Sequence, residues 1–374
     1  MSRTFATEVT PALEGIVAKL SPGARLLRVS PFGVDDSAAD DAATLKGTGY
    51  GVPLRLDLLE PDGSSRTLVF HTEKADAFGH DRRADRAADM LLAFDRFGEI
   101  PRHVRALDVG AIGKGEGELV SLAGVGEFYL ITSYAPGRVY ADHLRTIADR
   151  GVASPADVAC ARSLAELLAD IHSTKHGGDP QGELRYRRAI RDLVGSGEGI
   201  FGLCDAYAPD VPGAPPDRLR AIEERCLAWR WKLKHKSERL CRTHGDFHPF
   251  NILVDDDGAI SLLDASRGCR GDAADDVACL AINYLFFAVE RPETWRAALR
   301  PLYLEFLAAY QARARDPELL AVCAPFFAWR GLVVANPVWY PGVSERARDR
   351  VLSFVEQVLD AARFEPGMAD AVFE

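Results

Sequence analysis

The sequence predicts an α+β protein of two lobes, a small β-rich N-terminal lobe and a larger, mainly helical C-terminal lobe. First, 374 residues exceed the size at which a single hydrophobic core usually keeps growing. Second, strand-like segments separated by Gly and Pro turns lie before residue 133. Third, apolar residues recur at helical spacing through most of the chain after it. We therefore divide the chain into residues 1–133 and 134–374.

The composition is that of an ordinary soluble globular protein. Hydrophobic residues make up 47% of the chain and charged residues 27%. No apolar run approaches the roughly 18 residues that suggest a membrane-spanning helix. Residues 1–20 lack the basic and apolar order of an export signal, and seven scattered cysteines indicate reduced thiols. We expect a cytoplasmic protein without membrane contact.

The net charge narrows the range of partners. A formal net charge of −10 disfavours nonspecific binding of nucleic acid, which requires a basic surface that displaces counterions. The charge is compatible with a cationic small-molecule partner, although a solvated acidic surface accounts for most of it. We expect no nucleic-acid partner, and the oligomeric state is left open.

The N-terminal lobe begins with strand-like segments. Residues 24–32, 52–59 and 67–72 read as strands, with a turn at residues 61–63. The connection before the second strand contains a Gly-x-Gly-x-Gly pattern formed by Gly47, Gly49 and Gly51. Glycine backbone can approach a phosphate group closely, but this pattern by itself fits a plain hairpin better.

A helix and further strands complete this lobe. Apolar residues recur at helical spacing over residues 81–97, and Gly98 and Pro101 end the predicted helix. Further strands are expected at residues 104–109, 118–122 and 128–134, the last of which runs into Ala135-Pro136-Gly137.

The C-terminal lobe is predicted to be mainly helical. Ser154-Pro155-Ala156-Asp157 combines a cap, a first-turn proline and an early acid, and its helix extends to His172, which we interpret as structural. Residues 218–236 and 293–364 are also helical in pattern. Aromatic residues at 325–329 and 336–340 fit a buried core better than a ligand wall.

The stretch that carries chemistry is residues 241–264. Two apolar segments flank an Asp-Asp-Asp-Gly turn, which predicts a β-hairpin. Asp246 and Asn251 precede this hairpin and Asp264 follows it. Phosphoryl transfer from a nucleotide requires a carboxylate near the acceptor hydroxyl and oxygen ligands for Mg²⁺, and Asp-x-x-x-x-Asn with a later Asp supplies both.

The segment His244-Gly245-Asp246-Phe247-His248-Pro249-Phe250-Asn251 resembles the catalytic loop of the aminoglycoside phosphotransferase and choline kinase-like family, which shares the protein-kinase-like fold. The resemblance implies that Asp246 is the catalytic base and that Asn251 and Asp264 bind Mg²⁺. It also implies that Asp272 and Asp276 brace the loop. The implied activity is transfer of the γ-phosphate of ATP or GTP to a hydroxyl of an aminoglycoside-like, sugar or amino-alcohol acceptor.

The same resemblance assigns nucleotide binding to the N-terminal lobe and catalysis and acceptor binding to the C-terminal lobe. Gly47, Gly49 and Gly51 would cover the phosphates, and the backbone of Ser133, Tyr134 and Ala135 would contact the base. The strand position at which the family has a phosphate-binding lysine falls on His71, with Lys74 just beyond it. Asp85 and Asp89 are candidates for the helix acid that pairs with this cation, or they belong to a solvated helix face.

Other interpretations remain open at this point. His244, Asp246 and His248 could form a transition-metal cluster, although the oxygen donors of Asn251 and Asp264 suit Mg²⁺ better. These loop residues could also act only as hydrogen-bonding caps. A nucleotide-binding pseudokinase or regulatory scaffold is the alternative function, favoured by His71 and by the lack of a helix Glu. The joint presence of Asp246, Asn251 and Asp264 argues for an enzyme.

Overall fold

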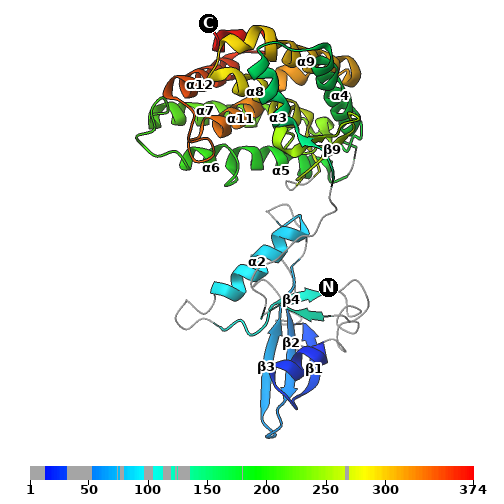
Figure 1. Cartoon of the computed structure of the whole chain (residues 1–374). Coiled ribbons are helices and arrows are strands. Elements are labelled where there is room, and N and C mark those ends of the chain that lie inside the picture. The colour runs from blue at the N-terminus through cyan, green and yellow to red at the C-terminus, as the bar shows by residue number, and fades with distance from the viewer. Residues whose placement is uncertain are drawn as a thin grey trace. The chain divides into compact units, whose positions relative to one another are not determined.

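The computed structural model describes residues 13–31, 53–73, 75, 80–96, 104–112, 119–122, 124, 135–178, 180–265 and 269–374. The chain divides into two compact units, Met1–Thr132 and Ser133–Glu374 (Figure 1). Each unit is described by itself, and the functional roles expected of the two lobes stay predictions.

The first unit is built on a three-stranded antiparallel sheet in the order β1 (Arg25–Pro31), β2 (Leu54–Leu59), β3 (Ser65–Phe70). Alternate residues of β2, Leu54, Leu56 and Leu58, are buried, as a strand with one covered face requires. Residues 13–20 are helical and add Leu13 and Val17 to the same small core. These strands confirm the first three predicted from the sequence.

The rest of the first unit contains one helix and a short hairpin. The helix α2 (Arg83–Arg96) falls within the predicted range, and β4 (Gly110–Ile112) pairs with β5 (Leu119–Ser121). The strand expected at residues 104–109 was wrong, because that segment has no regular secondary structure and strand pairing begins at Gly110. A Cβ at Gly110 would lie 2.3 Å from the carbonyl oxygen of Val120, so only glycine allows this close pairing.

The second unit begins with a short strand and a series of helices. Ser154 and Asp157 form the capping box predicted at the start of α4. The described elements up to the hairpin are β6 (Arg138–Val139), α3 (Tyr140–Arg150), α4 (Pro155–His172), α5 (Gly182–Gly195), α6 (Ile200–Asp205), α7 (Pro216–Leu233), the 3-10 turn η2 (Ser237–Arg239) and β7 (Leu240–Cys241).

The predicted hairpin lies in the middle of this unit. After the 3-10 turn η3 (Pro249–Asn251), β8 (Ile252–Val254) pairs antiparallel with β9 (Ile260–Leu262) and, on its other side, with β6. Asp255 closes the turn by accepting hydrogen bonds from the backbone N–H groups of Asp257 and Ala259. The strand β10 (Gly271–Asp272) then pairs with β7. This pairing joins the two ends of the segment that carries the loop and the hairpin.

The centre of the second unit is α8 (Ala273–Val289), which is buried along most of its length. It packs against α3, α9 (Arg300–Ala314), α11 (Ala324–Ala335) and α12 (Glu345–Asp360), and α4 lies along α9 (Figure 1). The π-helical turn η4 (Trp295–Leu299), α10 (Leu319–Val322) and η5 (Pro366–Val372) complete the fold. Phe326, Phe327 and Trp329 are buried, as predicted.

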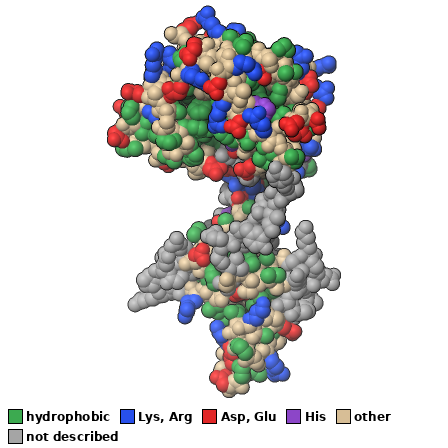
Figure 2. All heavy atoms as spheres, in the orientation of Figure 1, with side chains coloured by type: hydrophobic (Ala, Val, Ile, Leu, Met, Phe, Trp, Pro, Cys, Tyr) green, Lys and Arg blue, Asp and Glu red, His purple; other side chains and the backbone are tan. Residues whose placement is uncertain are grey.

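The visible surface of the second unit carries positive and negative side chains interspersed with apolar ones (Figure 2). Trp339, predicted to be a core residue, is instead 51% exposed. It lies beside exposed Val338 in the segment after α11, whereas the next residue, Tyr340, packs against the core. Among the described residues, no helix combines the length and the apolar character that a membrane span requires.

Candidate active site

The loop between β7 and η3 is shaped by its own side chains. Gly245 has a φ of +84°, a conformation that glycine adopts readily. The backbone N–H of Asp246 donates to His244 Nδ1 at 3.2 Å, and that of Phe250 donates to His248 Nδ1 at 3.1 Å. A neutral imidazole in this arrangement carries its hydrogen on Nε2, and both side chains hold the backbone of the loop by local hydrogen bonds.

Asp276, at the start of α8, braces this loop as predicted. Its carboxylate accepts hydrogen bonds from the backbone N–H groups of His244 and Gly245, at 2.7 and 2.8 Å. His172 lies 3.0 Å from the same carboxylate and 2.7 Å from the hydroxyl of Tyr310. Burial works against the charge, but these hydrogen bonds and the imidazole lower the pKa of Asp276 below its ordinary value. The loop is thus fixed to the central helix.

Asp246 points both carboxylate oxygens at hydrogen-bond donors. Arg330 Nη1 donates to Oδ1 at 2.6 Å, and Asn251 Nδ2 lies 3.3 Å from Oδ2. His248 Nε2 lies 3.5 Å from Oδ2. The Asp246 side chain retains 15% exposure, so an acceptor hydroxyl can reach it. This environment orients the carboxylate and leaves part of it open to solvent, as a base for a hydroxyl proton requires.

Arg330 was not singled out by the sequence analysis, and neither was Asp275. Arg330 projects from α11 and also donates to the carbonyl of Gly245 at 2.8 Å and to Asp275 Oδ1 at 2.7 Å. Its guanidinium carbon lies 3.9 Å from the ring centre of Trp329. Burial works against the charge, yet neighbouring groups that include Asp275 and Asp246 raise the pKa of Arg330. A lone Arg within an apolar run was the available signal, because a buried charge requires partners.

Asn251 and Asp264 meet at the two ends of the hairpin. The backbone N–H of Leu263 donates to the carbonyl of Asn251 at 2.9 Å, which places Asp264 one residue beyond that bond. Asn251 Nδ2 faces Asp246, so its amide oxygen is the atom left for a cation. Asp264 is exposed and has a φ of +53°, a conformation that Asp tolerates better than most residues. This oxygen donor set fits Mg²⁺.

The predicted nucleotide-binding residues are only partly described. His71 is exposed and directly follows β3, and Ala135 is half-buried just before β6. The remaining candidates lie outside the described residues: Gly47, Gly49, Gly51, Lys74, Ser133 and Tyr134.

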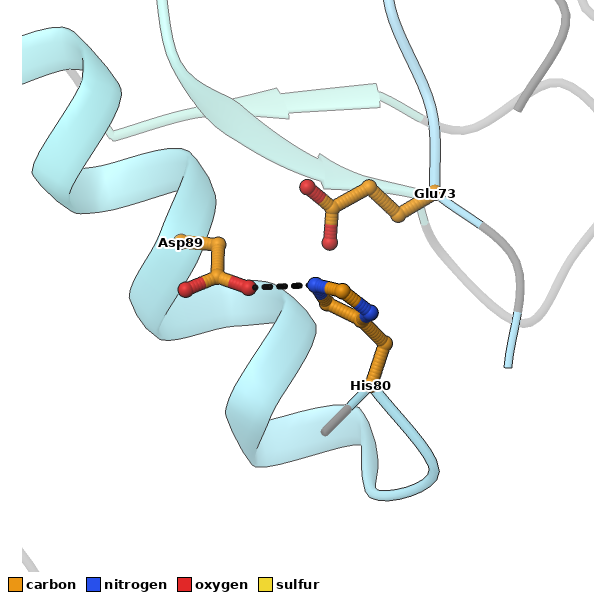
Figure 3. A group of neighbouring side chains, drawn as sticks. All are labelled: Glu73, His80 and Asp89. Atoms are coloured by element: carbon orange, nitrogen blue, oxygen red, sulfur yellow. Dashed lines mark ion pairs between the residues drawn. The ribbon is translucent and has the colours of Figure 1, made fainter. Parts of the chain in front are cut away.

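The two candidate helix acids of α2 have distinct partners. Asp85 accepts a hydrogen bond from the backbone N–H of Arg82 at 3.0 Å, which caps the helix start. Asp89 forms an ion pair with His80 Nε2 at 3.2 Å, and Glu73 approaches the same pair from the end of β3 (Figure 3). The side chain of Asp89 thus pairs with His80, a residue that the sequence did not single out.

The alternative of a transition-metal cluster in the loop is not supported by the geometry. His244 and His248 each use Nδ1 to accept a backbone hydrogen bond. Among the described residues, the group whose side chains could jointly hold a metal ion is Glu73, His80 and Asp89, in the first unit.

A family model described as the phosphotransferase enzyme family matches residues 59–321, more than half of the chain. The chain belongs to this family. The resemblance identified in the sequence, the enzyme class and the α+β two-lobed fold are thereby confirmed. No curated protein matches this phosphotransferase family member.

Solved structures similar to this family member include several kinases. A glucosamine kinase in complex with glucosamine, ADP and inorganic phosphate is 22% identical over 57% of this chain and 58% of its own, with a TM-score of 0.42. An aminoglycoside phosphotransferase, APH(3'')-Id from Streptomyces rimosus in complex with ADP and streptomycin, is 17% identical over 76% and 90%, with a TM-score of 0.33. A choline/ethanolamine kinase family protein from Mesorhizobium loti is 15% identical over 88% and 91%, with a TM-score of 0.34.

Proposed function

We propose that this protein is a small-molecule kinase that transfers the γ-phosphate of a nucleoside triphosphate to an acceptor hydroxyl. The observation that carries the proposal is the geometry of Asp246, a partly exposed carboxylate held by Arg330 and Asn251 in a loop braced by Asp276. Asn251 and Asp264 supply oxygen donors beside it. Family membership supports phosphoryl transfer as the reaction class.

The proposed mechanism uses Asp246 on the acceptor side. Its carboxylate orients the acceptor hydroxyl and takes its proton as the oxygen attacks the γ-phosphorus. The bond from that phosphorus to the β–γ bridging oxygen breaks, and the nucleoside diphosphate leaves. Asn251 and Asp264 would hold Mg²⁺, which supplies positive charge against the phosphate oxygens when bound. Arg330 positions Asp246 and does not itself touch the reacting atoms.

We infer ATP or GTP as the phosphate donor and a hydroxylated amine, sugar or aminoglycoside-like molecule as the acceptor. Gly47, Gly49 and Gly51, with His71 or Lys74, stay candidates for the phosphate contacts, and Ser133 to Ala135 for the base. We also infer a cytoplasmic location, which is supported by seven cysteines that are all free thiols.

The test is acceptor-dependent release of nucleoside diphosphate by the full-length protein with Mg²⁺. Amino alcohols, amino sugars and aminoglycosides would be screened with ATP and with GTP, and phosphorylated product confirmed by mass spectrometry. We expect at least one acceptor to stimulate turnover, and the Asp246→Asn variant to bind nucleotide without that stimulation. Tight MgATP binding with no acceptor turnover in the whole panel would contradict the proposal and support a pseudokinase.

A further inference from the structure

We propose that Glu73, His80 and Asp89 form a binding site for a divalent transition metal, with Zn²⁺ as the best-suited ion (Figure 3). The site lies in the first unit. Of its three residues, only Asp89 was also considered for phosphoryl transfer, as a candidate partner of the phosphate-binding cation, and none of the three holds the acceptor or Mg²⁺ in the proposed mechanism.

The three side chains converge from separate segments of the first unit. Glu73 follows β3, His80 precedes α2, and Asp89 lies within α2, with its carboxylate directed at the imidazole (Figure 3). One ligand atom from each residue lies within 4.8 Å of the others. The observed 3.2 Å between His80 Nε2 and Asp89 Oδ2 is close to the spacing of two tetrahedral Zn²⁺ ligands, about 3.3–3.5 Å for metal–ligand bonds near 2.0–2.2 Å.

The position of His80 is fixed from outside the cluster. Arg86 Nη1 donates to the carbonyl of His80 at 2.6 Å and to that of Asp81 at 3.2 Å. Arg86 thus holds the backbone before α2 in place, so that the imidazole is directed at Asp89 before any ion binds. A site with its ligands already positioned loses less conformational entropy on binding.

The donor types select the kind of ion. One imidazole nitrogen with two carboxylate oxygens suits Zn²⁺ and neighbouring transition metals, whereas Mg²⁺ and Ca²⁺ favour oxygen ligands alone. The two carboxylates beside the imidazole supply anionic oxygen ligands for a divalent ion. Asp89 is 46% exposed, which gives an ion access and leaves room for water as a fourth ligand.

A bound ion would join the end of β3 to α2. Metal and proton compete for His80 Nε2, so affinity should fall as the pH is lowered through the range in which the imidazole becomes protonated. The competing explanation is a protonated His80 held between two carboxylates, which requires no metal and becomes weaker when the pH is raised.

The experiment measures Zn²⁺ binding to the full-length protein after chelator treatment, by competition with a chromophoric chelator at pH 7.5 and pH 5.5. The ligand variants are His80→Ala, Glu73→Gln and Asp89→Asn. Matched controls are His71→Ala, an exposed histidine of the same unit, and Asp85→Asn on the same helix. Circular dichroism of each metal-free variant verifies folding.

We expect the wild type to bind one equivalent of Zn²⁺. Each ligand variant should bind it about tenfold or more weakly, since metal sites lose this much affinity even when residues beyond the direct ligands are changed. The zinc affinity of both controls should equal that of the wild type. Binding should weaken at pH 5.5, and Zn²⁺ should slow amide exchange across residues 83–96 in the wild type and in both controls, but not in the ligand variants. Equal zinc affinity in wild type and His80→Ala would overturn the proposal. The proposal would also be overturned if the wild type bound no zinc and the amides of α2 exchanged most slowly at pH 5.5, as a protonated His80 held between the two carboxylates requires.

Discussion

Arg330 Nη1 donates a hydrogen bond to Asp246 Oδ1 at 2.6 Å across a sequence separation of 84 residues. The same guanidinium binds Asp275 and the carbonyl of Gly245, so α11, the start of α8 and the catalytic loop meet at one side chain. Buried ion pairs of this kind add little net stability, because desolvation offsets the Coulomb attraction. Their value here is positional, since they fix the orientation of the Asp246 carboxylate.

Arg330→Ala should lower kcat by about 10²-fold with the nucleotide KM nearly unchanged, because misplacing a catalytic group by about 1 Å costs that much. Exogenous guanidinium should restore part of the lost kcat, which a purely structural defect would not allow. Arg313→Ala, which removes an exposed pair with Asp170, is the control. Unchanged kcat in a folded Arg330→Ala variant would exclude the positioning role.

The sequence allowed prediction of those parts of the candidate site whose geometry depends on residues close together in the chain. The loop and the hairpin follow from local pattern, because short turns leave few alternatives, whereas the brace from Asp276 was implied by the family resemblance. Arg330 and Asp275 reach Asp246 through helix packing, which no local spacing encodes. His80 was missed for the same reason, since its partner Asp89 depends on how the preceding segment meets α2.

Asp246→Asn should reduce kcat by about 10²–10⁴-fold, the usual contribution of a positioned acid–base group, while nucleotide affinity stays within about twofold of wild type. The amide keeps the size of the side chain but cannot accept the hydroxyl proton. Steady-state kinetics and nucleotide titration measure the two effects separately. A parallel loss of nucleotide affinity would show that Asp246 acts on the phosphate side instead.

Asp264→Asn should weaken Mg²⁺-dependent nucleotide binding, because an amide supplies no negative charge for the ion. The fold should be retained, since Asn adopts the observed positive φ as readily as Asp. Calorimetric titration with ATP, with and without Mg²⁺, measures the effect. Asp256→Asn, in the exposed turn of the same hairpin, should bind MgATP like the wild type. Equal MgATP affinity in both variants would contradict the assignment of Asp264 as a Mg²⁺ ligand.

Asp276→Ala should destabilise the second unit by about 3–5 kcal/mol, because it leaves two backbone N–H groups and His172 without their buried partner. All five tryptophans lie in this unit, so their fluorescence during urea unfolding reports on it alone. Asp149→Ala, which breaks an exposed pair with Arg291, should change the unfolding free energy by less than about 0.5 kcal/mol. Similar losses in both variants would contradict the assigned brace.

Arg239 gives the second unit a pH-dependent stabilisation. It is buried and pairs with Asp272 at 2.8 Å and with Asp316 at 2.9 Å. Burial opposes ionisation of Asp316, but the hydrogen bonds and charge of Arg239 lower the pKa of that carboxyl below its ordinary value. As the pH falls, Asp316 therefore takes up a proton in the unfolded state before it does so in the folded state. This stabilisation is fully present above the pKa of Asp316 in the unfolded state, and it is lost as the pH falls through the lower pKa of the folded state.

Arg239→Met should accordingly cost about 3–5 kcal/mol of unfolding free energy at pH 7, because it removes the buried charged partner that Asp272 and Asp316 share. The difference from wild type should shrink at pH 3, because protonation of Asp316 removes its attraction to Arg239 in the wild type and its uncompensated charge in the variant. Urea unfolding followed by tryptophan fluorescence at both pH values measures it. A difference of equal size at pH 7 and pH 3 would mean that Arg239 stabilises the unit by packing and not by charge.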